Sequence, residues 1–393
     1  MVVIMKKILS LLILTISIIV LCACSSNDDK KSSSEYKIAL VTDYDDVDDH
    51  SFNQTTYEAC VDFSNDHKME FNYFKPEEDS KEQREAMIVK AVEEGYNIIV
   101  LPGFAFADSI ADLASNYENV KFIALDISKA SLMDSVNLSD RLDDKQKSEF
   151  VAFDNVYCAS FKEEISGFLA GYSAVSLGYT DLGFVGGMKI PAVQRYGYGF
   201  LQGCDYAAKL SDQEVNIRFG YANSFTGSAE LTKATKKWYQ NGCEVIFACG
   251  GKLFTSVAEA ASELDKKMIG VDVDQSQTVD TYYKEGIVLT SAMKGLYPAT
   301  YNTLDKIVNL NQWNMIAGKY DSLGLVSSNP TINYCQIPME TTEFDSNYTE
   351  EDYKNLVNSL FLGEIEISDK VDELPQTTNT KLMYWWDVCE INN

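Results

Sequence analysis

One acidic stretch brings carboxylates, an aromatic ring and an amide together within twelve residues. Positions 43–54 read DYDDVDDHSFNQ and follow the apolar run 38–41. Five acids ended by Ser-Phe-Asn-Gln are unsuited to a strand or a core helix, so we expect a loop at the carboxyl end of the first strand of an open α/β sheet, where such folds bind ligands. There Ser51 could cap the next helix, Phe52 could cover a flat ligand, and Asn53 could offer a paired donor and acceptor. The alternative is a solvated acidic turn with Phe52 in the core.

Polar residues or glycines recur where other strands are expected to end. A carboxylate at such a position can grip vicinal hydroxyls, because it accepts two hydrogen bonds in a fixed geometry. Phe225 lies in the sequence NSFTG and could face Phe52, and a base stacked on an aromatic ring gains ~1–3 kcal/mol. Lys294 could add a cation on the sugar side. For any one of these residues, capping or core packing is the alternative role. The positions at expected strand ends are Asp43, Asp126, Gly250, Gly251, Asp272 and Asp274.

Motifs for catalysis or metal binding are missing from the sequence. The chain has two histidines, His50 and His67, and neither has a serine or cysteine nearby in a nucleophile-elbow context. The sequence also lacks the common catalytic and nucleotide-binding motifs, namely HExxH, Walker A, G-x-S-x-G, and G-x-G-x-x-G after a strand. We therefore predict no catalytic residue, no metal site and no cofactor. A pair of cleft carboxylates acting as in a glycosidase stays open as an alternative.

Length, charge and cysteine use narrow the class of protein further. The 393 residues suffice for two domains, and the net charge of −26 without a basic patch argues against a nucleic-acid partner. No CxxC pair occurs, so we expect neither a disulfide framework nor a zinc site. Besides Cys22 and Cys24, the cysteines are Cys60, Cys158, Cys204, Cys243, Cys249, Cys335 and Cys389.

The first residues predict the location of the protein. Lys6 and Lys7 precede an almost wholly apolar run, 8–20, and the sequence LCAC then ends at Cys24. This layout predicts a signal peptide over 1–23 and resembles a lipobox, in which Cys24 carries the lipid. Residues 24–36 are expected to form a flexible tether, and two acyl chains would attach the protein stably to the outer face of the cell membrane. An uncleaved signal anchor is the alternative.

Short apolar runs alternate with amphipathic segments from Tyr36 onward, which predicts parallel βαβ units and doubly wound sheets. The polar segment 131–147 looks like a surface insertion. We expect a first lobe over 37–153 plus about 291–318, and a second over 154–290 plus about 319–393. Strands are expected at 38–42, 69–74, 98–101, 121–125, 182–185, 214–220, 245–248, 267–271 and 287–290, and helices at 54–65, 81–94, 107–117, 161–176, 196–209, 229–241, 253–264, 299–309 and 349–360. Two such lobes would leave a cleft that closes on a small ligand.

Several motifs together resemble one known family. The chain is similar to the basic membrane protein family of substrate-binding lipoproteins, the PnrA-like purine nucleoside receptors of ABC transporters. The similarity runs from about residue 37 to 367 and implies a type I periplasmic-binding fold, with ABC permease and ATPase subunits as partners on other chains and a monomeric receptor. The matching segments are D-x-x-x-V-D-D-x-S-F-N-Q at 43–54, FKEEISGFLAG at 161–171, GFVGGM at 183–188, the step 191–195, NSFTG at 223–227, ACGG at 248–251, IGVDVDQ at 269–275, and the tail segments 320–325 and 349–353.

The resemblance also implies roles for single residues. The base would stack between Phe52 and Phe225, while Asn53 and Asp126 would read its edge. Gly251, Asp272 and Lys294 would handle the ribose, and Asp43 and Asp108 would be further acids at or near the ligand.

The sequence departs from the family pattern at the expected mouth of the site. Asp45 and Asp46 stand where glycines are usual, and Lys252 and Leu253 replace a small residue and a glycine. These differences bear on the choice of base more than on nucleoside binding itself. The remaining alternatives are an extracytoplasmic nucleoside or glycoside hydrolase, and a nucleoside-sensing lipoprotein without a transport role.

Overall fold

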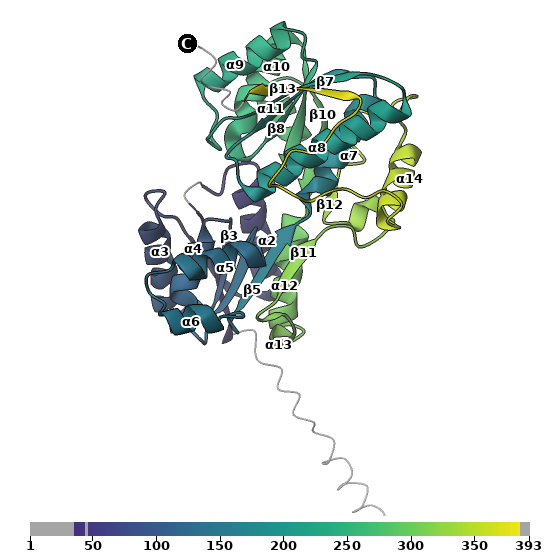
Figure 1. Cartoon of the computed structure of the whole chain (residues 1–393). Coiled ribbons are helices and arrows are strands. Elements are labelled where there is room, and N and C mark those ends of the chain that lie inside the picture. Colours follow the sequence, from purple (N-terminus) through teal and green to yellow (C-terminus); the bar gives the residue numbers. More distant parts are fainter. Residues whose placement is uncertain (1–34, 44–45, 386–393) are drawn as a thin grey trace, which may run out of the picture. The chain divides into compact units, whose positions relative to one another are not determined.

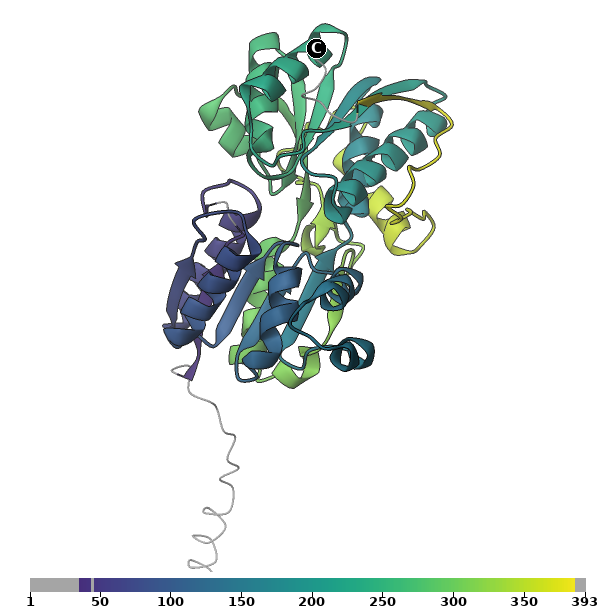
Figure 2. The ribbon, with the colours of Figure 1, turned by 60° about the vertical axis from the view of Figure 1, so that its left-hand side comes forward.

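Two mainly parallel sheets organise the computed structural model, which describes residues 35–43 and 46–385 (Figure 1). The predicted signal peptide, Cys24, most of the tether and Cys389 lie outside the described residues. Helices cover both faces of each sheet (Figure 2). This arrangement confirms the predicted α/β class and explains why the strands read as apolar runs, since a parallel sheet is buried on both faces.

The first sheet has six strands in the order β11-β5-β4-β3-β1-β2. In β1, Ile38, Ala39, Leu40 and Val41 are fully buried, as expected for a central strand. Its strands are β1 (Lys37–Val41), β2 (Glu70–Phe74), β3 (Ile98–Pro102), β4 (Lys121–Leu125), β5 (Val156–Phe161) and β11 (Tyr320–Leu323).

The second sheet has seven strands in the order β12-β10-β9-β8-β6-β7-β13. Only β12 runs antiparallel to its neighbour among the pairings described. Its strands are β6 (Asp181–Gly186), β7 (Val215–Tyr221), β8 (Val245–Cys249), β9 (Lys267–Asp272), β10 (Val288–Lys294), β12 (Cys335–Gln336) and β13 (Thr380–Trp385).

Each sheet and the helices packed on it form what we call the first and the second lobe. The helices of the first lobe are α2 (Phe52–His67), α3 (Lys81–Glu93), α4 (Phe106–Leu113), α5 (Lys129–Leu138), α6 (Asp144–Glu149), α12 (Leu296–Val308) and α13 (Trp313–Ile316). Those of the second are α7 (Glu163–Ser176), α8 (Pro191–Leu210), α9 (Ala229–Gln240), α10 (Phe254–Leu264), α11 (Ser276–Tyr282) and α14 (Glu350–Phe361). None of the helices in the described ranges combines the length and the apolar character needed to cross a membrane.

Two helices of the second lobe approach each other unusually closely. A Cβ atom added to Gly167 of α7 would lie 2.1 Å from the carbonyl oxygen of Tyr196 in α8, and one on Gly199 would lie 2.1 Å from that of Glu164. The glycines in FKEEISGFLAG therefore let the α7 and α8 backbones touch. This contact fixes the start of α8, which lines the pocket described below.

The chain crosses between the lobes three times, and the crossings differ from the predicted boundaries. Strand β5 was not predicted, and both β5 and β11 belong to the first sheet, beyond the expected ends of that lobe at 153 and 318. Strand β10 continues to Lys294 in the second sheet, past the expected boundary at 291. The reason is that each of these strands pairs with its neighbours along its whole length before the chain leaves the sheet. The crossings therefore follow the strand ends at Phe161, Lys294 and Leu323.

The segment 131–147 is helical rather than irregular. It contributes to α5 and α6, and Leu132 and Val136 of α5 are buried against the first core. Capping boxes at Ser128 and Asp143 begin these two helices.

Candidate functional site

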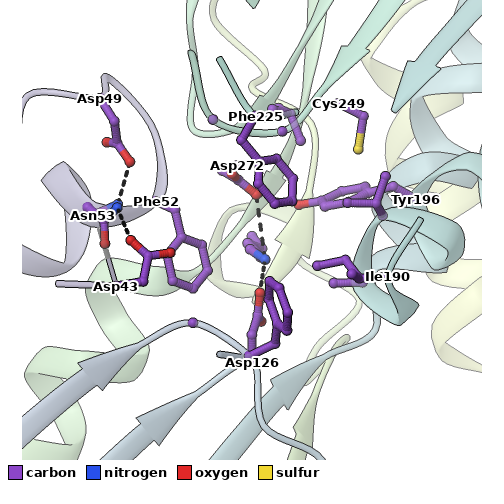
Figure 3. Close-up of a pocket in the computed structure, with 18 residues that line it drawn as sticks. Asp43, Asp49, Phe52, Asn53, Asp126, Ile190, Tyr196, Phe225, Cys249 and Asp272 are labelled. Atoms are coloured by element: carbon purple, nitrogen blue, oxygen red, sulfur yellow. Dashed lines mark hydrogen bonds and ion pairs between the residues drawn. The ribbon is translucent and has the colours of Figure 1, made fainter. Parts of the chain in front are cut away.

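A pocket lies between the carboxyl ends of the two sheets, and both lobes line it (Figure 3). It contains about 630 Å³ of space free of protein atoms, part of it open to solvent. The predicted site residues that line it are Asp43, Phe52, Asn53, Asp126, Phe225, Gly251, Asp272 and Lys294.

Two other polar candidates lie elsewhere. Asp108 is exposed on α4, outside the pocket lining, and accepts a hydrogen bond of 2.5 Å from Ser135 Oγ. Asp274 accepts from the backbone of Ser276 at 3.1 Å and from Thr341 at 2.8 Å, so it caps the start of α11. The structure therefore gives neither residue a contact with the pocket.

Aromatic rings enter the pocket from both lobes. Phe52 begins α2 in the first lobe, and Phe225 comes from the loop after β7 in the second. The Phe225 ring rests on glycines: a Cβ atom on Gly187 would lie 2.4 Å from its Cδ1, and one on Gly250 would lie 2.7 Å away. These glycines leave the space that the ring occupies.

The two central acids have an unusual backbone conformation. Asp126 follows β4 and has φ of 59°, and Asp272 ends β9 and has φ of 65°. Few residues other than glycine adopt this left-handed conformation, and its strain is concentrated at functional sites. Both backbones turn sharply at the strand end, and both carboxyl groups line the pocket.

Lys294 lies at the end of β10 and is the centre of a buried charge cluster. Its Nζ is 2.6 Å from Asp126 Oδ2, 3.6 Å from Asp272 Oδ1 and 3.7 Å from Glu163 Oε1. It also lies 4.6 Å from the centre of the Phe52 ring, within the range of a cation–π contact. Burial alone would lower the pKa of Lys294, but the three carboxylates outweigh it and raise the pKa. The ammonium group therefore stays charged.

The cluster continues to Arg195 on α8 through Glu163. Glu163 is fully buried, and its Oε2 accepts a hydrogen bond from Arg195 Nε at 2.6 Å. Burial raises the pKa of Glu163, and the positive charges of Arg195 and Lys294 oppose that rise. The chain of charges from Asp126 to Arg195 thus passes through two of the crossings between the lobes.

Two buried acceptors in the pocket have no hydrogen-bond partner among the residues that the structure describes. They are Asn53 Oδ1 and Asp126 Oδ1. Native proteins leave few buried polar atoms unsatisfied, and each such atom calls for an explanation. Because both atoms belong to residues lining the same pocket, a ligand that donates hydrogen bonds would satisfy them.

Asp49 caps α2 in place of Ser51. Its carboxylate accepts from the backbone N–H groups of Ser51 at 2.9 Å, Asn53 at 2.8 Å and Gln54 at 3.0 Å. The prediction that Ser51 caps this helix was wrong, since a carboxylate two residues earlier reaches three donors at once. The Ser51 hydroxyl instead donates to Asp272 Oδ2 at 2.7 Å.

Several lining residues were not among the predicted site residues. Gly103 and Phe104 follow β3, so the strand-end argument could have found them. Asp49 belongs to the acidic stretch 43–54, whose local signal was present but was not applied to this residue. The remaining residues depend on how α8 and the strands pack, for which the sequence carries no local signal. The unpredicted lining residues are Asp49, Gly103, Phe104, Ile190, Ala192, Val193, Tyr196, Cys249 and Val271.

A family match covers most of the chain. The sequence model described as ABC transporter substrate-binding protein PnrA-like matches residues 36–370. The chain belongs to this PnrA-like family. The match spans both lobes and the whole pocket, and it confirms the resemblance drawn from the motifs.

Curated relatives and solved structures agree with this assignment. The chain is 26% identical over 290 residues to the ABC transporter nucleoside-binding protein BmpA of Lactococcus lactis, covering 70% of this chain and 75% of that protein. It is 30% identical over 304 residues to basic membrane protein B of Borreliella burgdorferi, covering 75% and 80%. Among solved structures, an ABC transporter solute-binding protein of Aeropyrum pernix superposes with a TM-score of 0.62 at 20% identity, covering 84% and 87% of the chains.

The PnrA-like assignment fixes the class of function. Proteins of this family are substrate-binding components of ABC transporters, so a small molecule in the cleft and permease and ATPase partners follow from it. The fold of the structural neighbour is that of a two-lobed solute receptor, as predicted.

Proposed function

We propose that this PnrA-like protein binds a nucleoside between its lobes, with purine nucleosides as the first choice, and delivers it to an ABC permease from the outer face of the membrane. The observation that carries the proposal is the convergence of aromatic rings, unpartnered acceptors and one buried ammonium on a single pocket. Each of these features matches one part of a nucleoside.

The aromatic rings suit the base. Phe52 and Phe225 reach the pocket from opposite lobes, and Phe104 adds a third ring. Stacking of a base on one aromatic ring is worth ~1–3 kcal/mol, and tenfold in affinity corresponds to about 1.4 kcal/mol. Two rings that cover both faces of the base would supply much of the binding free energy that corresponds to a micromolar dissociation constant.

The polar groups suit the base edge and the sugar. Asn53 Oδ1 and Asp126 Oδ1 are acceptors, so they would bind N–H groups of the base. Asp272 and Lys294 with the backbone of Gly251 would hold the ribose hydroxyls. Asn53 Nδ2 donates to Asp43 Oδ1 at 3.4 Å, so Asp43 would support the orientation of this amide. Among the described residues that line the pocket, four carry a carboxylate and one carries an ammonium, a balance that disfavours a phosphorylated ligand.

The name of one relative points in the same direction. The Lactococcus lactis protein is named as nucleoside-binding, and the matching region covers most of both chains. We extend this ligand class to the present chain on the strength of the pocket.

Binding without turnover is the expected behaviour. Purified protein incubated with adenosine, guanosine and inosine should retain nucleoside through gel filtration, and chromatography should find no free base. Retention of another class of compound by the protein, with none of these nucleosides retained, would refute the ligand assignment. Free base that disappears with Asp272→Asn would establish a hydrolase instead.

The membrane attachment can be tested separately. We propose that Cys24 becomes the lipid-modified first residue of the mature protein, which holds the receptor next to its permease. Replacing Cys24 by alanine should move the protein from the membrane fraction to the soluble fraction and abolish its labelling with a radioactive fatty acid. Labelling that persists in Cys24→Ala would show that the anchor lies elsewhere.

A further inference from the structure

The Ser51 hydroxyl makes a contact that its position in the chain does not require. Ser51 is fully buried at the start of α2, where a serine side chain normally caps the helix. Here Asp49 accepts from the first backbone N–H groups of α2, and Ser51 has no side-chain capping bond. The hydroxyl is therefore available for another partner.

That partner belongs to the other lobe. Ser51 Oγ donates to Asp272 Oδ2 at 2.7 Å, across 221 positions of sequence. The second oxygen of Asp272 interacts only with second-lobe groups in this cluster: Oδ1 accepts from Tyr196 Oη at 3.2 Å and lies 3.6 Å from Lys294 Nζ. The carboxylate is thus held by its own lobe through one oxygen and by the first lobe through the other.

Two neighbours of Ser51 in the first lobe also form hydrogen bonds with residues of the second lobe. The His50 carbonyl accepts from Gln275 Nε2 at 3.3 Å, and Asp48 Oδ1 accepts from Lys252 Nζ at 2.8 Å. Of the three contacts, only the one made by Ser51 reaches a residue that lines the pocket. That residue is Asp272, which is 5% exposed. The Asp48–Lys252 pair lies at the surface, where an ion pair contributes little.

We propose that Ser51 is a positioning residue that couples closure of the lobes to the orientation of Asp272. When the lobes close, the hydroxyl fixes the Asp272 carboxylate so that it faces the pocket. When they open, the carboxylate loses this donor and turns more freely about its side-chain bonds. This inference rests on the proposed function in one respect, since it treats Asp272 as a ligand-binding acid.

Ser51→Ala tests the coupling by binding measurements. The affinity for the nucleoside that binds wild type most tightly should fall about tenfold, the effect of losing one hydrogen bond to a charged group, and the loss should lie in faster dissociation. Ser64→Ala is the matched control, because Ser64 is also buried on α2 and its Oγ has no hydrogen-bond partner. That variant should bind as wild type does.

A double-mutant cycle with Asp272→Asn separates positioning from a general structural effect. In the Asp272→Asn background, Ser51→Ala should change the affinity less than twofold, because the charged acceptor is already gone. A full tenfold loss in that background, or wild-type affinity for Ser51→Ala alone, would overturn the proposal.

The lobe separation gives a readout that needs no ligand. Spin labels on cysteines introduced at Leu138 and Leu210, which are 79% and 66% exposed on different lobes, report the distance between the lobes. Ligand-free Ser51→Ala should show longer distances than Ser64→Ala, and identical distributions would contradict the coupling. If wild type binds no nucleoside, the proposed function fails, and this comparison still decides the role of Ser51.

Discussion

At the scale of single residues, the pocket depends on a few side chains with distinct tasks. Phe52 offers a flat face, and Lys294 supplies a positive charge 4.6 Å from the centre of that ring. Asn53 and Asp126 each present an acceptor that receives no hydrogen bond from any residue in the described part of the chain. Because these tasks differ, changing one residue should alter binding in a recognisable way.

Phe52→Ala should weaken nucleoside binding at least tenfold. The variant removes one stacking face, which is worth ~1–3 kcal/mol, while α2 keeps its cap at Asp49. Equilibrium fluorescence titration gives the dissociation constant. Phe361→Ala is the control, since Phe361 is 44% exposed at the end of α14 and should be neutral. Equal affinity of the two variants would exclude stacking by Phe52.

Glu163→Gln should lower the free energy of unfolding by roughly 3 kcal/mol, because it removes the charge that compensates Arg195 inside the protein. The carboxylate is fully buried and 2.6 Å from Arg195. Urea denaturation followed by circular dichroism measures the change. Glu70→Gln breaks an exposed 2.8 Å pair with Lys37 and should change the free energy of unfolding very little. A similar small effect for both variants would mean that the buried pair adds no stability.

At the scale of elements, strand ends and helix starts bring these residues together. The carboxyl ends of β4, β9 and β10 carry Asp126, Asp272 and Lys294. The strand-end rule predicted the two aspartates from the sequence, because parallel strands in an open sheet end at the ligand crevice. Lys294 was predicted only as a cation following strand 287–290, and β10 in fact continues to this residue. Phe104 was not predicted although it follows β3, and Tyr196 was not predicted because its orientation depends on how α8 packs.

Most of the strands could be predicted from the sequence, because they are apolar runs between segments with a helical pattern. Four strands were not predicted: β11, β12 and β13 in the last part of the chain, and β5 before the first crossing between the lobes. The β5 sequence VYCASF is only moderately apolar, and the helical pattern of FKEEISGFLAG extended the predicted helix back over Phe161. The crossings between lobes were misplaced for the same reason, because sheet membership is decided by long-range pairing. Ser51 was misassigned since a distant carboxylate competes for its hydroxyl.

Gly187→Ala should reduce nucleoside affinity about tenfold through Phe225. An added Cβ would lie 2.4 Å from Phe225 Cδ1, so the ring must move out of its place in the pocket. The loss should disappear in a Phe225→Ala background, which calorimetry can measure. A tenfold loss that persists without the ring would show that the glycine acts through the backbone.

Glu164 in the first turn of α7 should make stability depend on pH. Burial raises its pKa to about 7, and the charge of Glu163 adds to this rise. The folded state therefore binds the proton more tightly than the unfolded state, whose carboxyl has the ordinary pKa. This contribution is fully present below the ordinary pKa of a glutamate and is lost as the pH rises through about 7.

The free energy of unfolding should consequently decline from pH 5 to pH 8, and Glu164→Gln should flatten that decline. Urea denaturation at several pH values measures both slopes. Glu366→Gln, at an exposed position away from the three crossings between the lobes, serves as the control and should keep the wild-type slope. A wild-type slope in Glu164→Gln would assign the pH dependence to other groups.

At the scale of the whole molecule, two lobes with separate cores meet at one polar pocket. Three crossings connect the lobes, and the buried charges of Glu163, Arg195 and Lys294 lie beside two of these crossings. Contacts from Asp48, His50 and Ser51 also join the lobes. A ligand held between them would favour the closed arrangement, as expected for a transport receptor.

Isothermal titration of the refolded, ligand-free protein tests the central claim most directly. The account predicts saturable binding of at least one purine nucleoside at one site per chain, with a dissociation constant in the micromolar range or below. It also predicts a negative heat-capacity change, because apolar surface is buried when the lobes close on the base. Absence of heat with adenosine, guanosine, inosine and the pyrimidine nucleosides would contradict it.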